Sequence, residues 1–290
     1  MRKKGRLRRG IGWVLVASLA WTRSSDVLAS DSFTGGHIVD TKWPEDPRNY
    51  EVSNRKVGNL GVLVPILEYH AANDVPGDEA TLRRGQLQQE LYWLKTHDFH
   101  TINFGQLYAA FYYGYKLPYR PILLTFDDGY ESFYTDVFPL LERYHFQATC
   151  FIIAGYVHTW MNTKAEFPTM TEAQLKQLQA SGLVDIEGHS YSHPYLTSVS
   201  PSRMEQEVRE SADILSKMVG HPIWVFCYPY GAYNAAVIHA VQESGYALAT
   251  TQNEGYARLS QGPFTLDRIP ILRDTSFAEF QSLLAPSLQN

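Results

Sequence analysis

The 290-residue sequence predicts a single α/β domain, a (β/α) barrel in which parallel strands alternate with helices. Short apolar runs alternate with helical patterns from residue 62 almost to the end of the chain, which indicates successive βαβ units. With 44% hydrophobic and 19% charged residues, the chain has enough apolar material for one large core. This many units favour a closed barrel over an open sheet, and the chemistry of such barrels lies at the carboxyl ends of the strands.

The first 29 residues predict an export signal. Six basic residues precede the apolar run 11–20, and a stretch of small residues follows, with Val27 and Ala29 spaced as in a cleavage site. We therefore expect a secreted or cell-surface protein. The run is shorter than the roughly 20 apolar residues of a membrane span, and membrane attachment is expected only if an uncleaved segment acts as an anchor.

The chain without residues 1–29 would be acidic. Removal of residues 1–29 takes away seven basic residues and Asp26. The remaining chain has 18 Lys and Arg against 29 Asp and Glu, a net charge of −11. Such a chain is poorly suited to nucleic acid or to an acidic polymer.

The chain after the signal divides into an extended, polar segment at 30–61, with Gly and Pro but no periodicity, and one domain at 62–290. Strands are expected at the apolar runs 62–69, around Thr101, 121–126, 148–153, 183–187, 223–228, 246–250 and 266–271. Helices are expected at 85–97, 106–113, 132–144, 172–180, 201–218, 234–244 and 277–284. Cys150 and Cys227 fall in expected core strands, where a buried free thiol is favoured over a disulfide.

Two adjacent carboxylates, Asp127 and Asp128, follow the strand at 121–126 in the segment TFDDGY. Asp and Gly are also ordinary turn residues, so the pair alone is compatible with a simple turn. At the end of a barrel strand, however, one carboxylate can hold a metal ion while the other accepts a proton from water.

Two histidines, His189 and His193, follow the strand at 183–187 in the segment EGHSYSHPYL. If the chain turns helically there, their rings lie on one face and can bind one ion. With Asp128 they would supply three ligands and leave a position open, as in catalytic zinc sites. Cobalt or nickel would also suit this ligand set.

A third polar turn, FCYPYG at 226–231, ends the strand at 223–228. Pro229 and Gly231 force the chain to turn, which can direct backbone N–H groups toward a developing oxyanion. A plain break between strand and loop is the alternative.

The three segments, in this order at strand ends, resemble the polysaccharide deacetylase family, the NodB-homology domain of carbohydrate esterase family four. The resemblance extends over about 62–271, and the opening VPILEYH is similar to the subgroup containing poly-N-acetylglucosamine deacetylases. It implies a deformed (β/α) barrel and metal-dependent removal of acetyl groups from an N-acetylated polysaccharide. By resemblance, Asp127 is the catalytic base, Asp128, His189 and His193 bind the metal, and the backbone N–H of Tyr230 helps to hold the oxyanion.

The sequence departs from the family pattern at two positions. Cys227 replaces the arginine that orients the base, and the late leucine-x-histidine motif that supplies the proton donor is missing. We expect Arg268 to orient Asp127 instead, because a carboxylate in a partly dry pocket needs a charged partner to stay ionised. His70 is the candidate for a further active-site contact, with a structural histidine as the alternative.

Several questions stay open at this stage. His158, Trp160, Tyr228 and Tyr230 are candidate sugar contacts, and for Trp160 and Tyr228 core packing is expected at least as strongly. The polymer could be poly-N-acetylglucosamine, peptidoglycan or chitin. An O-acetyl esterase acting on xylan and a non-catalytic carbohydrate-binding protein are the rival functions, and a monomer is expected.

Overall fold

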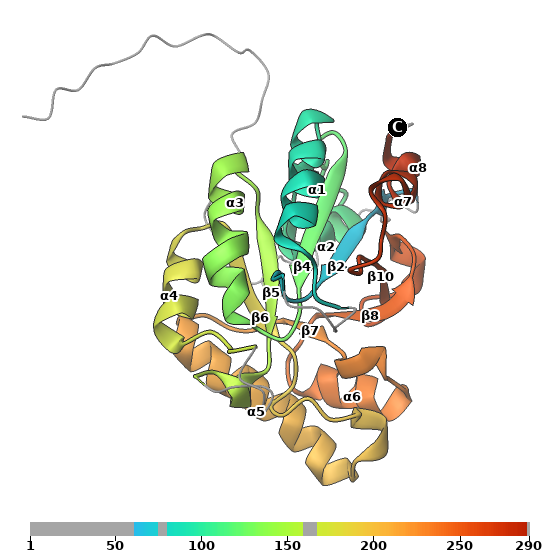
Figure 1. Ribbon diagram of the computed structural model, residues 1–290. Coiled ribbons are helices and arrows are strands. Elements are labelled where there is room, and N and C mark those ends of the chain that lie inside the picture. Colours follow the sequence, from blue (N-terminus) through green and yellow to red (C-terminus); the bar gives the residue numbers. More distant parts are fainter. Residues whose placement is uncertain (1–60, 75–79, 159–166, 289–290) are drawn as a thin grey trace, which may run out of the picture. The chain divides into compact units, whose positions relative to one another are not determined.

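The computed structural model describes residues 61–74, 80–158 and 167–288, which form a (β/α) barrel (Figure 1). Its sheet has eight strands, and because β2 also pairs with β4, seven parallel strands close a ring while β3 (His100–Thr101) lies outside it. Around the ring the order is β2 (Ile66–Tyr69), β10 (Leu266–Pro270), β8 (Leu248–Glu254), β7 (Val225–Cys227), β6 (Val184–Gly188), β5 (Ala148–Ile152) and β4 (Pro121–Phe126). The predicted barrel is confirmed.

Helices follow most of the strands, as the sequence predicts. They are α1 (Arg84–Thr96), α2 (Phe104–Tyr113), α3 (Phe138–Tyr144), α4 (Glu172–Ala180), α5 (Pro201–Val219), α6 (Ala235–Glu243), α7 (Phe277–Leu283) and the short α8 (Ala285–Leu288). Polar side chains define their starts: Asn103, Thr171 and Ser276 each form a capping box at the start of α2, α4 and α7.

The structure corrects the first predicted strand. The run 62–69 is interrupted at Pro65, which has no N–H to donate to a ladder. Its first part, β1 (Leu63–Val64), pairs with β9 (Ala257–Arg258) in a separate antiparallel sheet. The predicted helix at 132–144 likewise begins with a π-helical turn at Phe133–Val137, directly before the proline in the first turn of α3.

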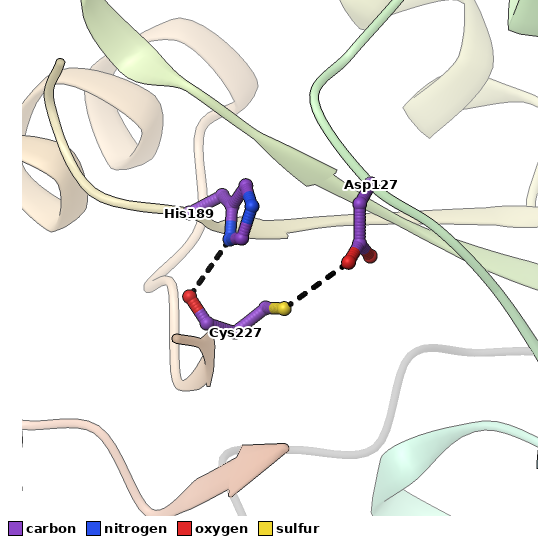
Figure 2. Close-up of side chains that lie close together, drawn as sticks. All are labelled: Asp127, His189 and Cys227. Carbon is purple, nitrogen blue, oxygen red and sulfur yellow. Dashed lines mark hydrogen bonds between the residues drawn. The ribbon is translucent and has the colours of Figure 1, made fainter. Parts of the chain in front are cut away.

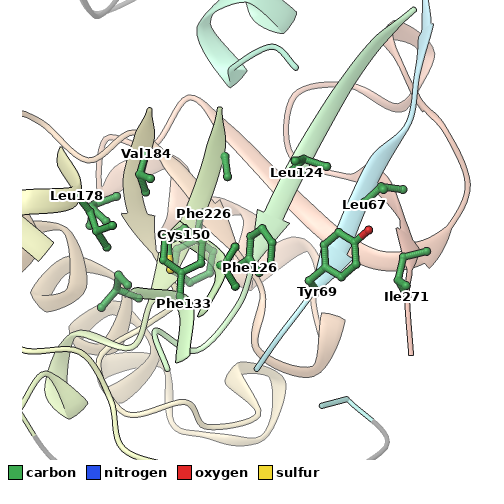
Figure 3. Close-up of a cluster of buried hydrophobic side chains, with 14 of the residues drawn as sticks. Leu67, Tyr69, Leu124, Phe126, Phe133, Cys150, Leu178, Val184, Phe226 and Ile271 are labelled. Carbon is green, nitrogen blue, oxygen red and sulfur yellow. The ribbon is translucent and has the colours of Figure 1, made fainter. Parts of the chain in front are cut away.

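Two apolar clusters form the core, one on each face of the ring. Residues such as Leu67, Phe126 and Cys150 pack between the strands and the outer helices (Figure 3). The second cluster includes Cys227 and, among others, Ile66, Leu123, Phe151, Val225 and Leu266, together with Phe104, Leu107 and Phe111 of α2. Cys150 and Cys227 therefore belong to different clusters, and both are free thiols, as expected.

Along three strands, residues of the second cluster are followed on the same face by polar residues. Because alternate residues of a strand share a face, Ile66 of β2 is followed on its face by Glu68. By the same spacing, Leu123 of β4 is followed by Thr125 and Asp127, and Leu266 of β10 by Arg268. On this face of β2, β4 and β10, apolar residues thus come first and polar residues follow toward the carboxyl end.

In the part of the chain that the structure describes, no helix is long and apolar enough to cross a membrane. The predicted export signal and nearly all of the extended segment at 30–61 lie outside the described residues.

Candidate active site

Asp127 and Asp128 lie where β4 ends, both almost completely buried. The Asp127 N–H donates to the Tyr69 carbonyl of the neighbouring strand, 2.9 Å away. Asp128 and Gly129 then adopt left-handed φ angles of 73° and 74°. A side chain at Gly129 would lie 2.9 Å from the Ile152 Cδ1, so this tight turn requires glycine at 129.

His189 and His193 converge on Asp128 from the loop that follows β6. Their Nε2 atoms lie 3.1 Å apart, and they lie 3.4 Å and 3.5 Å from the Asp128 Oδ1. The His189 Nδ1 lies 2.8 Å from the Cys227 carbonyl (Figure 2). This contact fixes the ring and leaves Nε2 facing Asp128. The loop is not the helical turn that the sequence suggested: Ser190 and His193 have left-handed φ angles of 61° and 57°, which bend the chain instead.

These three groups fit a metal ion. Their ligand atoms all lie within 4.8 Å of one another, and the buried Asp128 Oδ1 makes no hydrogen bond. Such an orphaned oxygen is costly unless a cation pairs with it. Two imidazole nitrogens and one carboxylate oxygen are a ligand set of catalytic zinc sites, in which three protein ligands leave a fourth position for water or substrate.

The protonation of the two imidazoles agrees with this arrangement. Burial, together with the charge of His189, lowers the pKa of His193 to about 4, so His193 is neutral at pH 7. Burial also lowers the pKa of His189, but Cys227 and Asp128 outweigh it and raise this pKa above its ordinary value. The pair therefore carries one positive charge on His189, and the proton on its Nε2 must leave when an ion binds there.

Arg268, from the middle of β10, forms a bidentate ion pair with Asp127. The Nη1 and Nη2 groups donate to the two carboxylate oxygens over 2.8 Å and 2.7 Å, and Nε donates to the Thr251 carbonyl. Burial raises the pKa of Asp127, but the Arg268 guanidinium outweighs burial and holds it well below the ordinary value. The contact expected from the sequence is present.

Cys227 leaves room for this contact. Its Sγ accepts a hydrogen bond from the Arg268 Nη2 at 3.2 Å and lies 3.4 Å from the Asp127 Oδ2, to which the thiol donates (Figure 2). The small thiol therefore stands beside the carboxylate at the position where the resemblance expects an arginine, and the guanidinium arrives from another strand.

Glu68 is a member of the site that the sequence analysis missed. It is buried on β2, with its Oε2 3.1 Å from the Arg268 Nη2 and its Oε1 accepting from the Gln252 Nε2 at 3.0 Å. Burial raises the pKa of Glu68, although Arg268 opposes the shift. The sequence feature that could have identified Glu68 is its position as a carboxylate inside the apolar strand ILEY. His70, two residues on and partly buried, has a ring nitrogen within 4.8 Å of carboxylate oxygens of both Glu68 and Asp127.

The turn after β7 also lies at the site. Tyr230 has left-handed backbone angles (φ 58°, ψ 18°), and its ring lies 4.4 Å from the His193 ring. Gly231, with a φ of 61°, packs against Gln252, whose Cβ would lie 2.7 Å from an added side chain. The turn therefore lies between His193 on one side and Gln252, which donates a hydrogen bond to Glu68, on the other.

Tyr230 thus lies beside the site, and the other three candidate sugar contacts have different outcomes. Tyr228 is completely buried and donates its hydroxyl to the Phe264 carbonyl, so core packing, the alternative expected for it, is confirmed. The His158 Nε2 accepts from the Glu172 N–H at the start of α4. Trp160 lies outside the described residues.

Comparison with known proteins agrees with this site. The model of the family described as polysaccharide deacetylase matches residues 114–249. YxkH of Bacillus subtilis, which is named as a polysaccharide deacetylase, is 26% identical over 245 residues, covering 83% of this chain and 82% of its own. The poly-β-1,6-N-acetyl-D-glucosamine N-deacetylase of Escherichia coli is 27% identical over 254 residues, covering 74% of this chain but only 37% of its own length.

A solved structure shows the same fold. The Streptococcus pyogenes deacetylase PplD, in complex with acetate, superposes with a TM-score of 0.71 at 27% identity, covering 78% of this chain and 99% of that one. The matched segment, the closed barrel and the superposition together identify a polysaccharide deacetylase domain in this chain.

Proposed function

We propose that this protein is a metal-dependent deacetylase that hydrolyses the N-acetyl groups of an N-acetylglucosamine-containing polysaccharide outside the cytoplasm. One observation carries the proposal: a carboxylate held ionised by Arg268 lies directly beside the orphaned Asp128 oxygen on which two imidazoles converge. Neighbouring carboxylates with such different partners suit different tasks.

Asp128, His189 and His193 would hold the ion, with zinc expected and cobalt or nickel compatible. When bound, a divalent ion polarises the acetamide carbonyl and lowers the pKa of a water molecule at the site. Asp127 accepts the proton of the attacking water. Arg268 keeps this carboxylate ionised and fixes its direction through two parallel hydrogen bonds. The Tyr230 N–H donates to the developing oxyanion.

His70 is the proposed proton donor to the departing amine. The family's late histidine is absent, and His70 is the remaining imidazole beside Asp127 in the described part of the chain. The His70 side chain is partly exposed, as a proton donor to a bound substrate must be. An amine leaves readily only when it is protonated, so this role is essential for an amide and dispensable for an ester with a good leaving group.

The substrate class rests on the relatives. The Escherichia coli protein that matches this chain is named for poly-β-1,6-N-acetylglucosamine, a neutral polymer. A chain with a net charge of −11 after loss of residues 1–29 suits a neutral polymer better than an acidic one. The basic and apolar pattern at 1–29 supports export to the compartment where such polymers occur.

The test uses the purified chain on acetylated glucosamine polymers and on acetylated xylan, with added zinc or chelator. Acetate release together with new free amines is expected, and chelator should abolish it. Acetate from xylan without new amines would indicate an O-acetyl esterase instead. His70→Gln should lose far more activity on the amide polymer than on an aryl acetate; equal losses on the two would remove His70 as the proton donor.

Two matched variants separate the roles of the neighbouring carboxylates. Asp127→Asn should retain metal and polymer binding but lose roughly 10² to 10⁴ in rate, the usual contribution of a general base. Asp128→Asn removes a charged ligand, so metal content and rate should fall together, and excess metal should restore part of the rate to Asp128→Asn alone. Metal analysis and turnover measure both. A wild type with no turnover on any of these polymers, and variants that bind sugar equally well, would indicate a binding protein.

A further inference from the structure

Two tyrosines with exposed rings stack on each other at the rim of the active site. Tyr195 is 53% exposed and Tyr230 is 45% exposed, yet their ring centroids are 3.9 Å apart with an interplanar angle of 9°. Among the large apolar side chains exposed in the described residues, no other pair is stacked. We call these two rings the tyrosine platform.

The tyrosine platform is continuous with the metal-binding residues. The Tyr230 ring centroid lies 4.4 Å from that of His193 and 3.9 Å from that of Tyr195, so Tyr230 contacts both residues. One face of Tyr195 is covered by Tyr230, so its large exposed fraction belongs to the other face and the ring edge. Tyr195 thereby presents an aromatic face to solvent next to Tyr230, the residue that borders the reaction centre.

The backbone holds Tyr195 rigidly in this position. Ser192 donates its N–H to the buried Glu207 of α5 over 2.7 Å, and the His193 N–H donates to the Ser190 Oγ over 2.9 Å. On the other side of Tyr195, Leu196 is buried and the Tyr195 carbonyl accepts from the Ser198 N–H at 2.8 Å. A ring fixed before binding loses little conformational entropy when a ligand stacks on it.

The chemistry of the platform matches a sugar ring. A pyranose has an apolar face of C–H groups that packs on an aromatic ring and hydroxyl groups around its edge that need hydrogen-bond partners. No hydrogen bond of either tyrosine hydroxyl occurs within the described parts of the chain, so both can pair with sugar hydroxyls.

We infer that the tyrosine platform binds the pyranose unit adjacent to the one being deacetylated, with Tyr195 as the stacking surface. The inference rests on the proposed function, because it takes the unit at the metal-binding residues to carry the acetamide. It makes the enzyme sensitive to chain length: a single N-acetylglucosamine unit reaches the reaction centre but not Tyr195, whereas an oligomer reaches both.

The test compares Tyr195→Ala, Tyr195→Phe and a matched control, Tyr92→Ala, whose exposed tyrosine lies on α1 away from the site. The substrates are N-acetylglucosamine and its pentamer. Tyr195→Ala should raise KM for the pentamer roughly threefold to tenfold, the range expected for losing one aromatic stacking contact. Its effect on the single sugar should be much smaller. Tyr195→Phe keeps the ring and loses only the hydroxyl, so its KM for the pentamer should rise less than that of Tyr195→Ala. Tyr92→Ala should stay close to wild type.

Each outcome has a distinct meaning. Equal losses on the sugar and the pentamer, or a lowered metal content in Tyr195→Ala, would show that Tyr195 only supports the metal-binding loop, and the inference fails. An unchanged pentamer KM also overturns it while leaving the deacetylase intact. If wild type has no turnover, calorimetric binding of the pentamer that weakens in Tyr195→Ala would sustain the platform and reject the proposed function. If the pentamer is neither bound nor hydrolysed, both fail.

Discussion

Asp127 and Arg268 are separated by 141 residues in the chain, yet they form the closest ion pair of the site. The guanidinium replaces an arginine that the family resemblance places at Cys227, and it approaches the same carboxylate from a different strand. What the base requires is a bidentate donor with a permanent charge, and any strand whose side chain reaches it can supply that donor.

Arg268→Ala should shift the acidic limb of the pH–rate profile upward. Without the guanidinium, burial dominates and the pKa of Asp127 rises above its present low value. Since only the ionised carboxylate accepts a proton, a higher pH is then needed for activity. Arg268→Lys keeps the positive charge but loses the pair of parallel hydrogen bonds, so the acidic limb of its profile should move less. The measurement is kcat/KM against pH; an unmoved limb in Arg268→Ala would assign Arg268 another role.

Glu68→Gln is the control for this prediction, because it alters the other carboxylate on the same guanidinium. Glu68 and Asp127 are both acidic and lie close together, so removal of the Glu68 charge favours ionisation of Asp127. The acidic limb should therefore stay in place or move downward. An upward shift in Glu68→Gln equal to that of Arg268→Ala would mean that both variants simply disrupt the pocket.

At the scale of the elements, α1 is joined to β2 by a buried polar contact. Glu90 of α1 is almost completely buried, accepts the Tyr69 hydroxyl over 3.1 Å, and is held by Gln86 one turn earlier. Burial raises the pKa of Glu90 from 4.5 to about 7. The native state of the protein therefore favours the protonated form of Glu90.

This contact makes the stability of the fold depend on pH. Between pH 4.5 and about 7 the native state holds the Glu90 proton more tightly than the unfolded chain does, so the free energy of unfolding should fall as pH rises through this window and then level off. The size is on the order of 3 kcal/mol. Glu90→Gln, which stays neutral, should lack this component. Urea unfolding at pH 5 and pH 8 measures it; identical pH dependence in the two proteins would contradict the prediction.

At the scale of the whole barrel, the first and last strands of the ring are neighbours. β2 pairs with β10 on one side and with β4 on the other, so Glu68, Arg268 and Asp127 lie side by side although they come from three distant segments. The proposed metal ligands connect a second set, the ends of β4 and β6. An ion bound to the folded state would tie these loops together.

Metal should consequently stabilise the fold as well as support activity. A ligand that binds only the native state adds about 2.7 kcal/mol when present at one hundred times its Kd. Thermal unfolding should therefore shift to higher temperature with added zinc and to lower temperature with chelator. Asp128→Asn is the matched variant, and its transition should respond much less. If neither zinc nor chelator changes the unfolding temperature of the wild type, the folded protein does not bind the ion.

Local patterns in the sequence determined much of this protein. Apolar runs and helical spacing located the strands and most of the helices, and the polar turns after β4, β6 and β7 identified the ends where the site forms. His189, His193, Asp127 and Asp128 could be predicted because each pair is close in sequence and follows a strand. Even here the loop geometry differed, since left-handed residues rather than a helical turn bring the two histidines together.

Only the tertiary structure decided which distant residues complete the site. Glu68 lies beside Arg268 only because the strands close into a ring, and Tyr195 stacks on Tyr230 only because the turn after β7 lies against its loop. The physical reason is that spacing within a segment is set by local backbone geometry, whereas contact across the barrel depends on strand order and register. Those are settled by the packing of the whole chain, in which each strand buries one face against the helices and the other inside the ring.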